Sequence, residues 1–377
     1  MNRIRKMSFA LVSVFLLFTS FSQAQELSNI KVGGRMMNDW AWMSPDDDVK
    51  TTVGDFTDGS EFRRLWLYTS GSINDYMDFI IQLDLTSGAV KFRDVYVALT
   101  GLPVTVKVGH IKEPFGLEIS TSSKYITFME RGLPSLFSPG WNNGIQFSSS
   151  AYNKRLNWVA GVFANTGGNG YSDTEEGYNL TARVTGTPLF ADDGAKLLHL
   201  GLSVTNRNTT DNTAYAQGPE MGLAPDMIDT KAFSCDKIMI YNGESALIHG
   251  PFSVQGELFL SNVSSGALND PSFFGYYGQA SYFITGEHRE YKSGVFSNVK
   301  PLKSYGSGGI GAVELAARYS YLDLDSGTLK GGTLSNMSVG VNWHFNSYSR
   351  VMVNIVRSEL KDVGFVNILG TRMQFFF

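Results

Sequence analysis

Basic residues recur on the polar faces of segments in which apolar and polar side chains alternate. Guanidinium groups bind phosphate-like oxyanions through paired N–H donors, and a lysine adds a mobile positive charge. On neighbouring strands such residues would form a ladder along which an anion can move. The residues expected on inward faces are Lys31, Arg35, Lys107, Arg183, Arg318 and Arg372.

Acidic residues are expected on the same inward faces. They are Asp39, Asp84, Asp94, Glu257 and Glu314. Each basic residue therefore has two possible roles: it lines an anion path, or it forms a structural ion pair across the wall. The alternation alone leaves both roles open.

Motifs for catalysis or metal binding are absent from the sequence. The histidines His110, His199 and His344 are scattered, with no H-E-x-x-H spacing, and there is no G-x-S-x-G elbow or P-loop. Cys235 is the only cysteine, which excludes an intrachain disulfide. We expect no enzymatic activity, no metal and no cofactor. An enzyme built on a barrel, with His110 or His199 as its base, is the alternative from another class.

The first 24 residues have the features of a secretory signal. Arg3, Arg5 and Lys6 precede an apolar run, and Ser22-Gln23-Ala24 supplies small residues at the cleavage position. Residues 25–377 are then the mature chain. Removing three basic residues from the 31 Lys+Arg leaves 28 against 35 Asp+Glu, a net charge of −7. This balance argues against a nucleic-acid partner.

Alternation with period two predicts an antiparallel β-barrel of about sixteen strands. No window after the signal segment holds 18 consecutive apolar residues, so membrane-spanning helices are not expected. The predicted strands cover residues 29–42, 60–72, 76–86, 91–100, 103–111, 142–151, 155–165, 177–187, 197–206, 236–247, 250–262, 275–285, 310–322, 334–346, 350–358 and 368–377.

The position of charge determines which face of each strand points outward. A Lys or Arg facing lipid near the middle of a bilayer costs about 2–4 kcal/mol, so the charged faces must line the lumen. In the last predicted strand, Leu369, Met373, Phe375 and Phe377 then face lipid, whereas Arg372 faces inward. A chain that ends on exposed phenylalanines is typical of a barrel in an outer membrane.

The connections between predicted strands differ in kind. Several are turns of a few residues, whereas Ser44–Gly59, Thr166–Gly177 and Arg207–Cys235 are long and polar. The connection over residues 112–142 carries Phe115, Phe128 and Phe137, so we expect it to fold into the barrel and narrow it. The segment Gly286–Gly309 is unusually long for a periplasmic turn. Either it also packs into the lumen, or the strand count is wrong near it.

Several ordered segments resemble the phosphate-selective porin O and P family, and together they span most of the mature chain. They are Phe62-Arg63-Arg64-Leu65-Trp66-Leu67, Gln82-Leu83-Asp84-Leu85, Val106-Lys107-Val108-Gly109, Phe115-Gly116-Leu117-Glu118, Thr121-Ser122-Ser123-Lys124, Glu130-Arg131, Tyr276-Tyr277-Gly278-Gln279, Thr285-Gly286-Glu287, Val299-Lys300-Pro301 and Gly340-Val341-Asn342-Trp343.

The resemblance implies a trimeric barrel in the outer membrane of a Gram-negative bacterium, which passes anions such as phosphate. It implies that Arg63 and Arg64 match the family's Phe-Arg-Arg pair, and that Lys124 contributes to a central anion site. Asp94 lies near the family's lumen acid, one residue out of register. Lys300 and Lys303 match part of a lysine cluster, but Val295 stands where another lysine is expected, which weakens the implied phosphate preference.

The pair Arg63 and Arg64 poses a geometric problem. Neighbouring residues on an ideal strand point to opposite faces, so both cannot enter the lumen unless one lies above the bilayer or at a bulge.

The expected function is passive diffusion of small anions, with phosphate or polyphosphate preferred. A general channel without phosphate preference, a carbohydrate-specific channel and a plugged structural barrel are the alternatives. The expected partners are small anions, outer-membrane lipids and two further copies of the chain.

Overall fold

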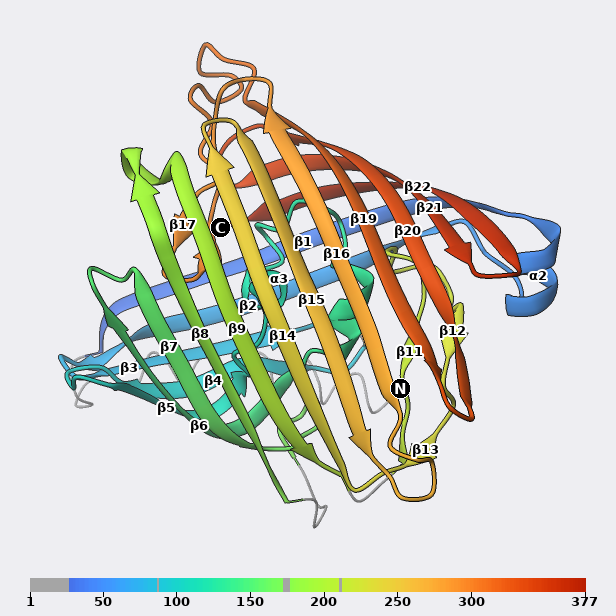
Figure 1. The fold of residues 1–377 in the computed structure, drawn as a ribbon. Helices are drawn as coiled ribbons and strands as arrows, with labels where there is room; N and C mark the ends of the chain where they lie inside the picture. The colour runs from blue at the N-terminus through green and yellow to red at the C-terminus, as the bar shows by residue number, and fades with distance from the viewer. Residues whose placement is uncertain (1–26, 87, 172–176, 210–211) are drawn as a thin grey trace, which may run out of the picture.

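The computed structural model describes residues 27–86, 88–171, 177–209 and 212–377. The predicted signal segment over residues 1–24 lies outside this part, so it stays a prediction. The described chain forms a closed barrel of sixteen antiparallel strands, in which each strand pairs with its neighbour along the chain (Figure 1). The predicted fold class is confirmed.

The sixteen barrel strands correspond one to one with the predicted segments. They are β1 (Ser28–Pro45), β2 (Gly59–Asn74), β3 (Met77–Asp84), β4 (Lys91–Leu99), β5 (Thr105–Lys112), β6 (Trp141–Ala151), β7 (Leu156–Ala164), β8 (Tyr178–Ala191), β9 (Lys196–Asn208), β14 (Lys237–His249), β15 (Phe252–Ser264), β16 (Ser272–Phe283), β19 (Ala312–Ser326), β20 (Leu329–His344), β21 (Ser349–Leu360) and β22 (Gly364–Phe376).

Short elements occupy the connections. They are α2 (Asp47–Val53), α3 (Leu117–Ser120), η1 (Leu133–Phe137), η2 (Asp192–Gly194), β10 (Asn212–Thr213), β11 (Ala216–Gln217), β12 (Ile228–Asp229), β13 (Phe233–Ser234), β17 (Tyr291–Lys292) and β18 (Val295–Phe296). Among the described residues, no helix is long and apolar enough to cross a bilayer.

The orientation deduced from charge is confirmed along the strands. On β22, Leu369 and Phe375 are exposed on the outer face, whereas Arg372 is fully buried inside. On β20, Val339 and Trp343 face outward, and Asn342 is buried inside.

The ring closes where β22 pairs with β1. Their register runs from Arg35 opposite Phe376 to Pro45 opposite Val366. At the centre of this seam, the guanidinium of Arg372 donates two hydrogen bonds of 2.6 Å to the carboxylate of Asp39. The ion pair therefore joins the first strand to the last on the lumen side.

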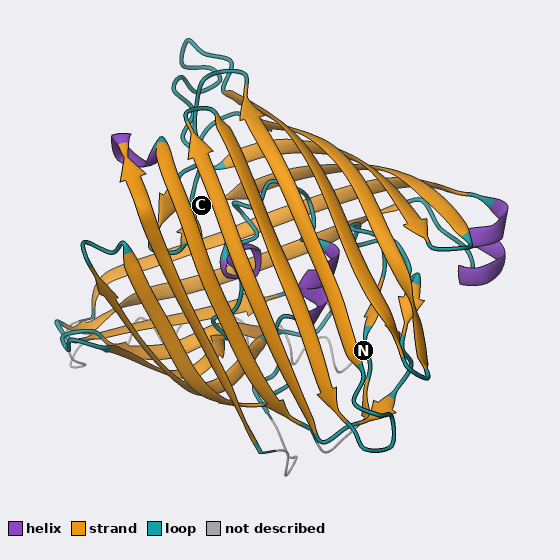
Figure 2. Ribbon diagram, viewed as in Figure 1, coloured by secondary structure: helices purple, strands orange, loops and turns teal. Residues whose placement is uncertain are grey.

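The connection between β5 and β6 folds into the lumen, as predicted. Figure 2 shows its two helical turns, α3 and η1, inside the ring of strands. Phe115, Phe128 and Phe137 are all buried. We call residues 113–140 the inner loop.

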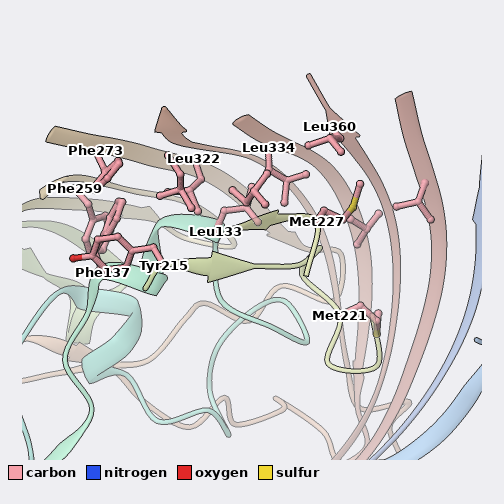
Figure 3. Packing of buried hydrophobic residues seen from close by; sticks show 14 of the residues in the cluster. Leu133, Phe137, Tyr215, Met221, Met227, Phe259, Phe273, Leu322, Leu334 and Leu360 are labelled. Carbon is pink, nitrogen blue, oxygen red and sulfur yellow. The ribbon is translucent and has the colours of Figure 1, made fainter. Parts of the chain in front are cut away.

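The connection between β9 and β14, which the sequence analysis described only as long and polar, contains a buried apolar part. Its β11–β12 hairpin lies inside the barrel and buries Met221, Met227 and Ile228. These side chains pack with η1 against an apolar inner wall that includes Leu322 and Leu334 (Figure 3). The inward faces of β19 and β20 are therefore apolar around Leu322 and Leu334, because they contact inserted loops and not water.

The long connection between β16 and β19 also enters the lumen, which was the first of the two expected alternatives. Its short β17–β18 hairpin meets the opposite wall, where Arg183 donates a 2.7 Å hydrogen bond to the carbonyl of Gly294 and His199 contacts the Tyr291 hydroxyl at 2.7 Å. The backbone N–H of Phe296 donates to the hydroxyl of Thr121 in the inner loop, at 3.2 Å. The strand count is therefore correct near this segment.

Candidate functional site

Two adjacent bulges concentrate charged side chains on the β1–β6 side of the lumen. The register between β1 and β2 shifts where Met37 pairs with Arg64 and Asn38 pairs with Phe62, which leaves Arg63 as the extra residue. A bulge locally breaks the alternation of a strand. As a result, Arg63 and Arg64 both line interior cavities, which resolves the geometric problem posed by the pair.

A second bulge lies between β3 and β4. Ile81 pairs with Val95 and Leu83 with Phe92, so Arg93 and Asp94 together oppose Gln82. Both Arg93 and Asp94 border the same cavity as Arg64. Arg93 donates a 2.6 Å hydrogen bond to Asp84, and its guanidinium lies 4.8 Å from the ring centroid of Trp66 and 4.7 Å from that of Trp141.

These residues surround a cavity of about 420 Å³, which we call the cationic chamber. Seven basic side chains line it against two carboxylates, those of Asp84 and Asp94. The basic residues are Arg35, Arg63, Arg64, Lys91, Arg93, Lys112 and Arg131. Their excess makes the chamber electropositive in a chain whose net charge is −4.

The inner loop supplies the other wall of the chamber. The guanidinium of Arg35 donates to the hydroxyl of Ser123 at 2.9 Å and to that of Ser122 at 3.2 Å. Arg131 donates to the backbone carbonyls of Glu118 and Thr121, both at 3.0 Å. These acceptors are uncharged oxygen atoms, so they position the guanidinium groups of Arg35 and Arg131 without neutralising their positive charge.

Lys124 lies next to the chamber, on the side of a smaller cavity that it shares with Arg350 and Gln374. Its ammonium nitrogen lies 4.6 Å from the ring centroid of Phe376 and 5.2 Å from that of Tyr125. Burial, together with the nearby positive charge of Arg35, lowers the pKa of Lys124 to about 8. The charge of this lysine can therefore be removed at mildly alkaline pH.

Glu130 is the carboxylate that organises the arginine pair. Its Oε1 accepts a 2.8 Å hydrogen bond from Arg63 and lies 3.7 Å from Arg64 and 2.8 Å from Arg372. Burial opposes its ionisation, but these three guanidinium groups outweigh burial and hold the pKa of Glu130 far below its usual range. A second cavity of about 310 Å³ begins at Arg63, Arg64 and Arg131, and extends to the inserted connection between β9 and β14.

Several residues predicted to line the path lie elsewhere. Arg183 is paired with Glu244 at 2.7 Å, and Arg318 forms an ion pair with Glu220 and lies 3.5 Å from Glu118. Of the two roles that the sequence allowed for basic residues, Arg183 and Arg318 therefore have the geometry of structural ion pairs. Lys107 shares the inward face of β5 but does not border the chamber; its ammonium lies 4.6 Å from the Tyr96 ring.

Lys300 and Lys303 are two further residues predicted to line the path. Both are exposed in the connection between β16 and β19. Neither borders the chamber. They follow Val299, which is buried against Phe283 and Ala312. The role in a central lysine cluster that the resemblance implies stays a prediction.

Sequence reasoning missed four of the basic residues in the chamber: Lys91, Arg93, Lys112 and Arg131. It also missed Trp66 and Trp141, whose rings meet edge to face at 5.9 Å and whose indole N–H groups are buried without a partner in the described chain. The residues Arg93-Asp94 directly follow Phe92, much as Arg63-Arg64 follow Phe62, and this likeness was the available signal.

A larger hollow, of about 700 Å³, lies on the outer wall among Leu200, Leu202 and Leu258. These leucines are exposed on the apolar outer face. Within the described ranges, no group of three His, Cys, Asp or Glu side chains is placed to hold a metal ion.

A family model described as phosphate-selective porin O and P matches residues 30–377, which is nearly the whole described chain. This chain belongs to that family. It is accordingly an outer-membrane porin. Porin O of Pseudomonas aeruginosa is 26% identical over 403 aligned positions, which cover 93% of this chain and 88% of the relative. An uncharacterised protein of Caulobacter vibrioides is 29% identical and covers 84% of this chain and 68% of its own length.

Solved porins share the fold of this family member at low sequence identity. An anion-selective porin from Comamonas acidovorans has a TM-score of 0.61 at 14% identity, covering 93% of this chain and all of its own. OmpT of Vibrio cholerae in its trimer form has a TM-score of 0.56 at 12% identity, covering 93% of this chain and all of its own. These likenesses confirm the barrel architecture.

Proposed function

We propose that this porin conducts small anions, with phosphate or polyphosphate preferred, by passive diffusion through the cationic chamber. The observation that carries the proposal is the excess of seven basic side chains over two carboxylates around a cavity of about 420 Å³. A ring of one sign of charge selects the opposite ion in a channel.

The chamber also offers groups that can replace the hydration of an oxyanion. Arginine forks and the hydroxyls of Ser122 and Ser123 border it, and Trp66 and Trp141 line it as well. An oxyanion that loses water in a narrow passage requires such donors. Arg63 and Arg64 border both the chamber and the second cavity, so they would receive an anion that enters from outside.

The route continues past Arg35 to Lys124. Arg35 donates to the hydroxyls of Ser122 and Ser123, which directly precede Lys124 in the chain, and its charge helps to lower the pKa of Lys124. Assembly as a homotrimer is part of the proposal, because a solved relative of the same fold is described in a trimer form.

The test is block of chloride current by added phosphate in planar bilayers. We compare the wild-type channel with Arg63→Gln/Arg64→Gln, and with Lys107→Gln as a matched control outside the chamber. Phosphate should block the wild-type and control channels at similar concentrations and should block the double variant more weakly. Anion current without phosphate block would retain the channel and remove the phosphate preference. Block by sugars instead would favour the carbohydrate channel.

A further inference from the structure

The connection between β16 and β19 leaves the lumen and folds back over the outside of the barrel rim. After buried Val299, the chain turns outward, and the indole N–H of Trp343 donates a 2.7 Å hydrogen bond to the carbonyl of Ile310. Trp343 belongs to the outward face of β20. The backbone N–H of Tyr305 donates to the carbonyl of Phe345 at 2.7 Å, and the rings of Tyr305 and Trp343 lie 5.8 Å apart. We call residues 300–310 the rim loop.

Hydrogen bonds fix the conformation of the rim loop. The backbone N–H of Gly311 donates to the carbonyl of Lys303, a bridge joins Tyr305 to Gly309, and the backbone N–H of Leu302 donates to buried Glu287 at 2.9 Å. Gly311 has a φ of +82°, and a Cβ there would lie 2.2 Å from the carbonyl oxygen of His344. A glycine is therefore required where the loop returns to β19.

The loop exposes apolar side chains that nothing in the barrel covers. Leu302 is 71% exposed, Tyr305 61% and Ile310 62%. Tyr305 continues the outward apolar belt, because it packs beside Trp343, and Trp343 follows Val341 and Val339 on the same face. Continuity with the lipid-facing belt indicates a lipid surface as the partner.

Charge indicates which part of the lipid lies here. Residues 291–313 contain Lys292, Lys300 and Lys303 and no Asp or Glu, in a chain with an overall excess of acidic residues. Lys300 and Lys303 are exposed, and the described chain gives them no ion pair. Exposed lysines beside apolar and aromatic side chains match the boundary where anionic headgroups meet acyl chains.

We propose that the rim loop is a binding site for anionic phospholipids of the periplasmic leaflet. Lys300 and Lys303 bind the headgroup phosphate, and Leu302, Tyr305 and Ile310 enter the adjoining acyl region. The site gives the two lysines a role outside the anion path. It lies outside the lumen, so it is independent of the proposed ion selectivity.

Native mass spectrometry of the full-length porin tests the proposal. The protein is mixed in detergent with phosphatidylglycerol or phosphatidylcholine, and the lipid that stays bound after the detergent is removed in the spectrometer is measured. The wild-type protein should retain phosphatidylglycerol preferentially. Loss of a lysine near an anionic surface weakens binding about fivefold, so Lys300→Gln/Lys303→Gln should weaken retention about 25-fold. Lys292→Gln is the matched control, because it removes a charge from the same connection on the β17–β18 hairpin inside the lumen.

Further readouts separate the alternatives. Tyr305→Ser/Ile310→Ser should shorten retention of both lipids without changing the oligomeric mass, and single-channel selectivity should be unchanged in every rim-loop variant. Heat-modified gel mobility would verify that each variant forms a barrel. The proposal is overturned if the wild-type protein shows no preference for phosphatidylglycerol, if Lys300→Gln/Lys303→Gln retains it fully, or if Lys292→Gln loses as much. A change in oligomeric mass would assign the surface to a second copy of the chain and would also overturn it.

Discussion

Lys124 is an inner-loop residue of the proposed path whose charge can be removed at mildly alkaline pH. Arg35, Arg63 and Arg64 carry guanidinium groups, whose ordinary pKa lies well above that of a lysine ammonium. Burial and the neighbouring charge of Arg35 bring the pKa of Lys124 to about 8. Because the pKa is lowered, the ammonium is fully charged well below pH 8 and loses its proton as the pH rises through this value.

The first prediction is a pH-dependent anion preference. The permeability ratio of chloride to potassium should be constant below about pH 7 and should fall as the pH rises through about 8. Lys124→Arg should retain the preference at high pH, and Lys124→Glu should shift the channel towards cations at every pH. Reversal potentials measured across this range provide the check. If wild type and Lys124→Arg respond identically to pH, Lys124 does not lie on the path.

At the scale of elements, one wall carboxylate anchors the first turn of the inner loop. Glu257 on β15 accepts the backbone N–H groups of Leu117 and Glu118, at 2.7 and 2.8 Å, and the hydroxyl of Tyr277 at 2.6 Å. Gly116 precedes them with a φ of +61°, and a Cβ there would lie 2.7 Å from Glu257. The close approach of the loop to the wall therefore depends on both residues.

The second prediction concerns this anchor. Glu257→Ala leaves buried donors without acceptors, at a cost of about 1–3 kcal/mol for each group. The inner loop should loosen, so single-channel conductance should rise and become noisier, and anion preference should fall. Glu257→Gln keeps an acceptor oxygen and should have a smaller effect. A Glu257→Ala channel with wild-type conductance would show that the other contacts of the loop, such as those made by Arg35 and Arg372, hold it without Glu257.

Some of these elements could be predicted from the sequence, and others could not. Alternation identified all sixteen strands and their lipid-facing sides, since lipid tolerates few charges on one face. It missed the inserted connection between β9 and β14, although Met221 and Met227 were a signal that this connection is too apolar for water. The bulges at Arg63 and Arg93-Asp94 depend on pairing register, which a single strand does not encode.

At the scale of the whole molecule, the side chains that close the barrel between β1 and β22 also contact the inner loop that borders the proposed anion path. Arg372 pairs with Asp39 across the seam and with Glu130 of the inner loop, and it donates to the carbonyl of Met129. Glu130 in turn holds Arg63. One buried network therefore connects the first strand, the last strand and the inner loop.

The third prediction is that Arg372→Ala destabilises the barrel. It leaves Asp39 and Glu130 buried with less compensation, and breaking a buried ion pair in this way costs about 3–5 kcal/mol. The temperature at which the folded band disappears in heat-modifiability gels should fall. Lys107→Gln, which changes an inward charge without an ion pair in the described chain, should leave it nearly unchanged. Equal stability of Arg372→Ala and wild type would show that backbone pairing alone closes the seam.

The reversal potential of the wild-type channel under a potassium chloride gradient tests the central claim most directly. The excess of basic side chains around the chamber predicts a potential of the sign set by chloride, reduced when Arg35, Arg63 and Arg64 are replaced together by glutamine. A wild-type reversal potential with the opposite sign, which indicates that potassium is more permeant than chloride, would contradict the account.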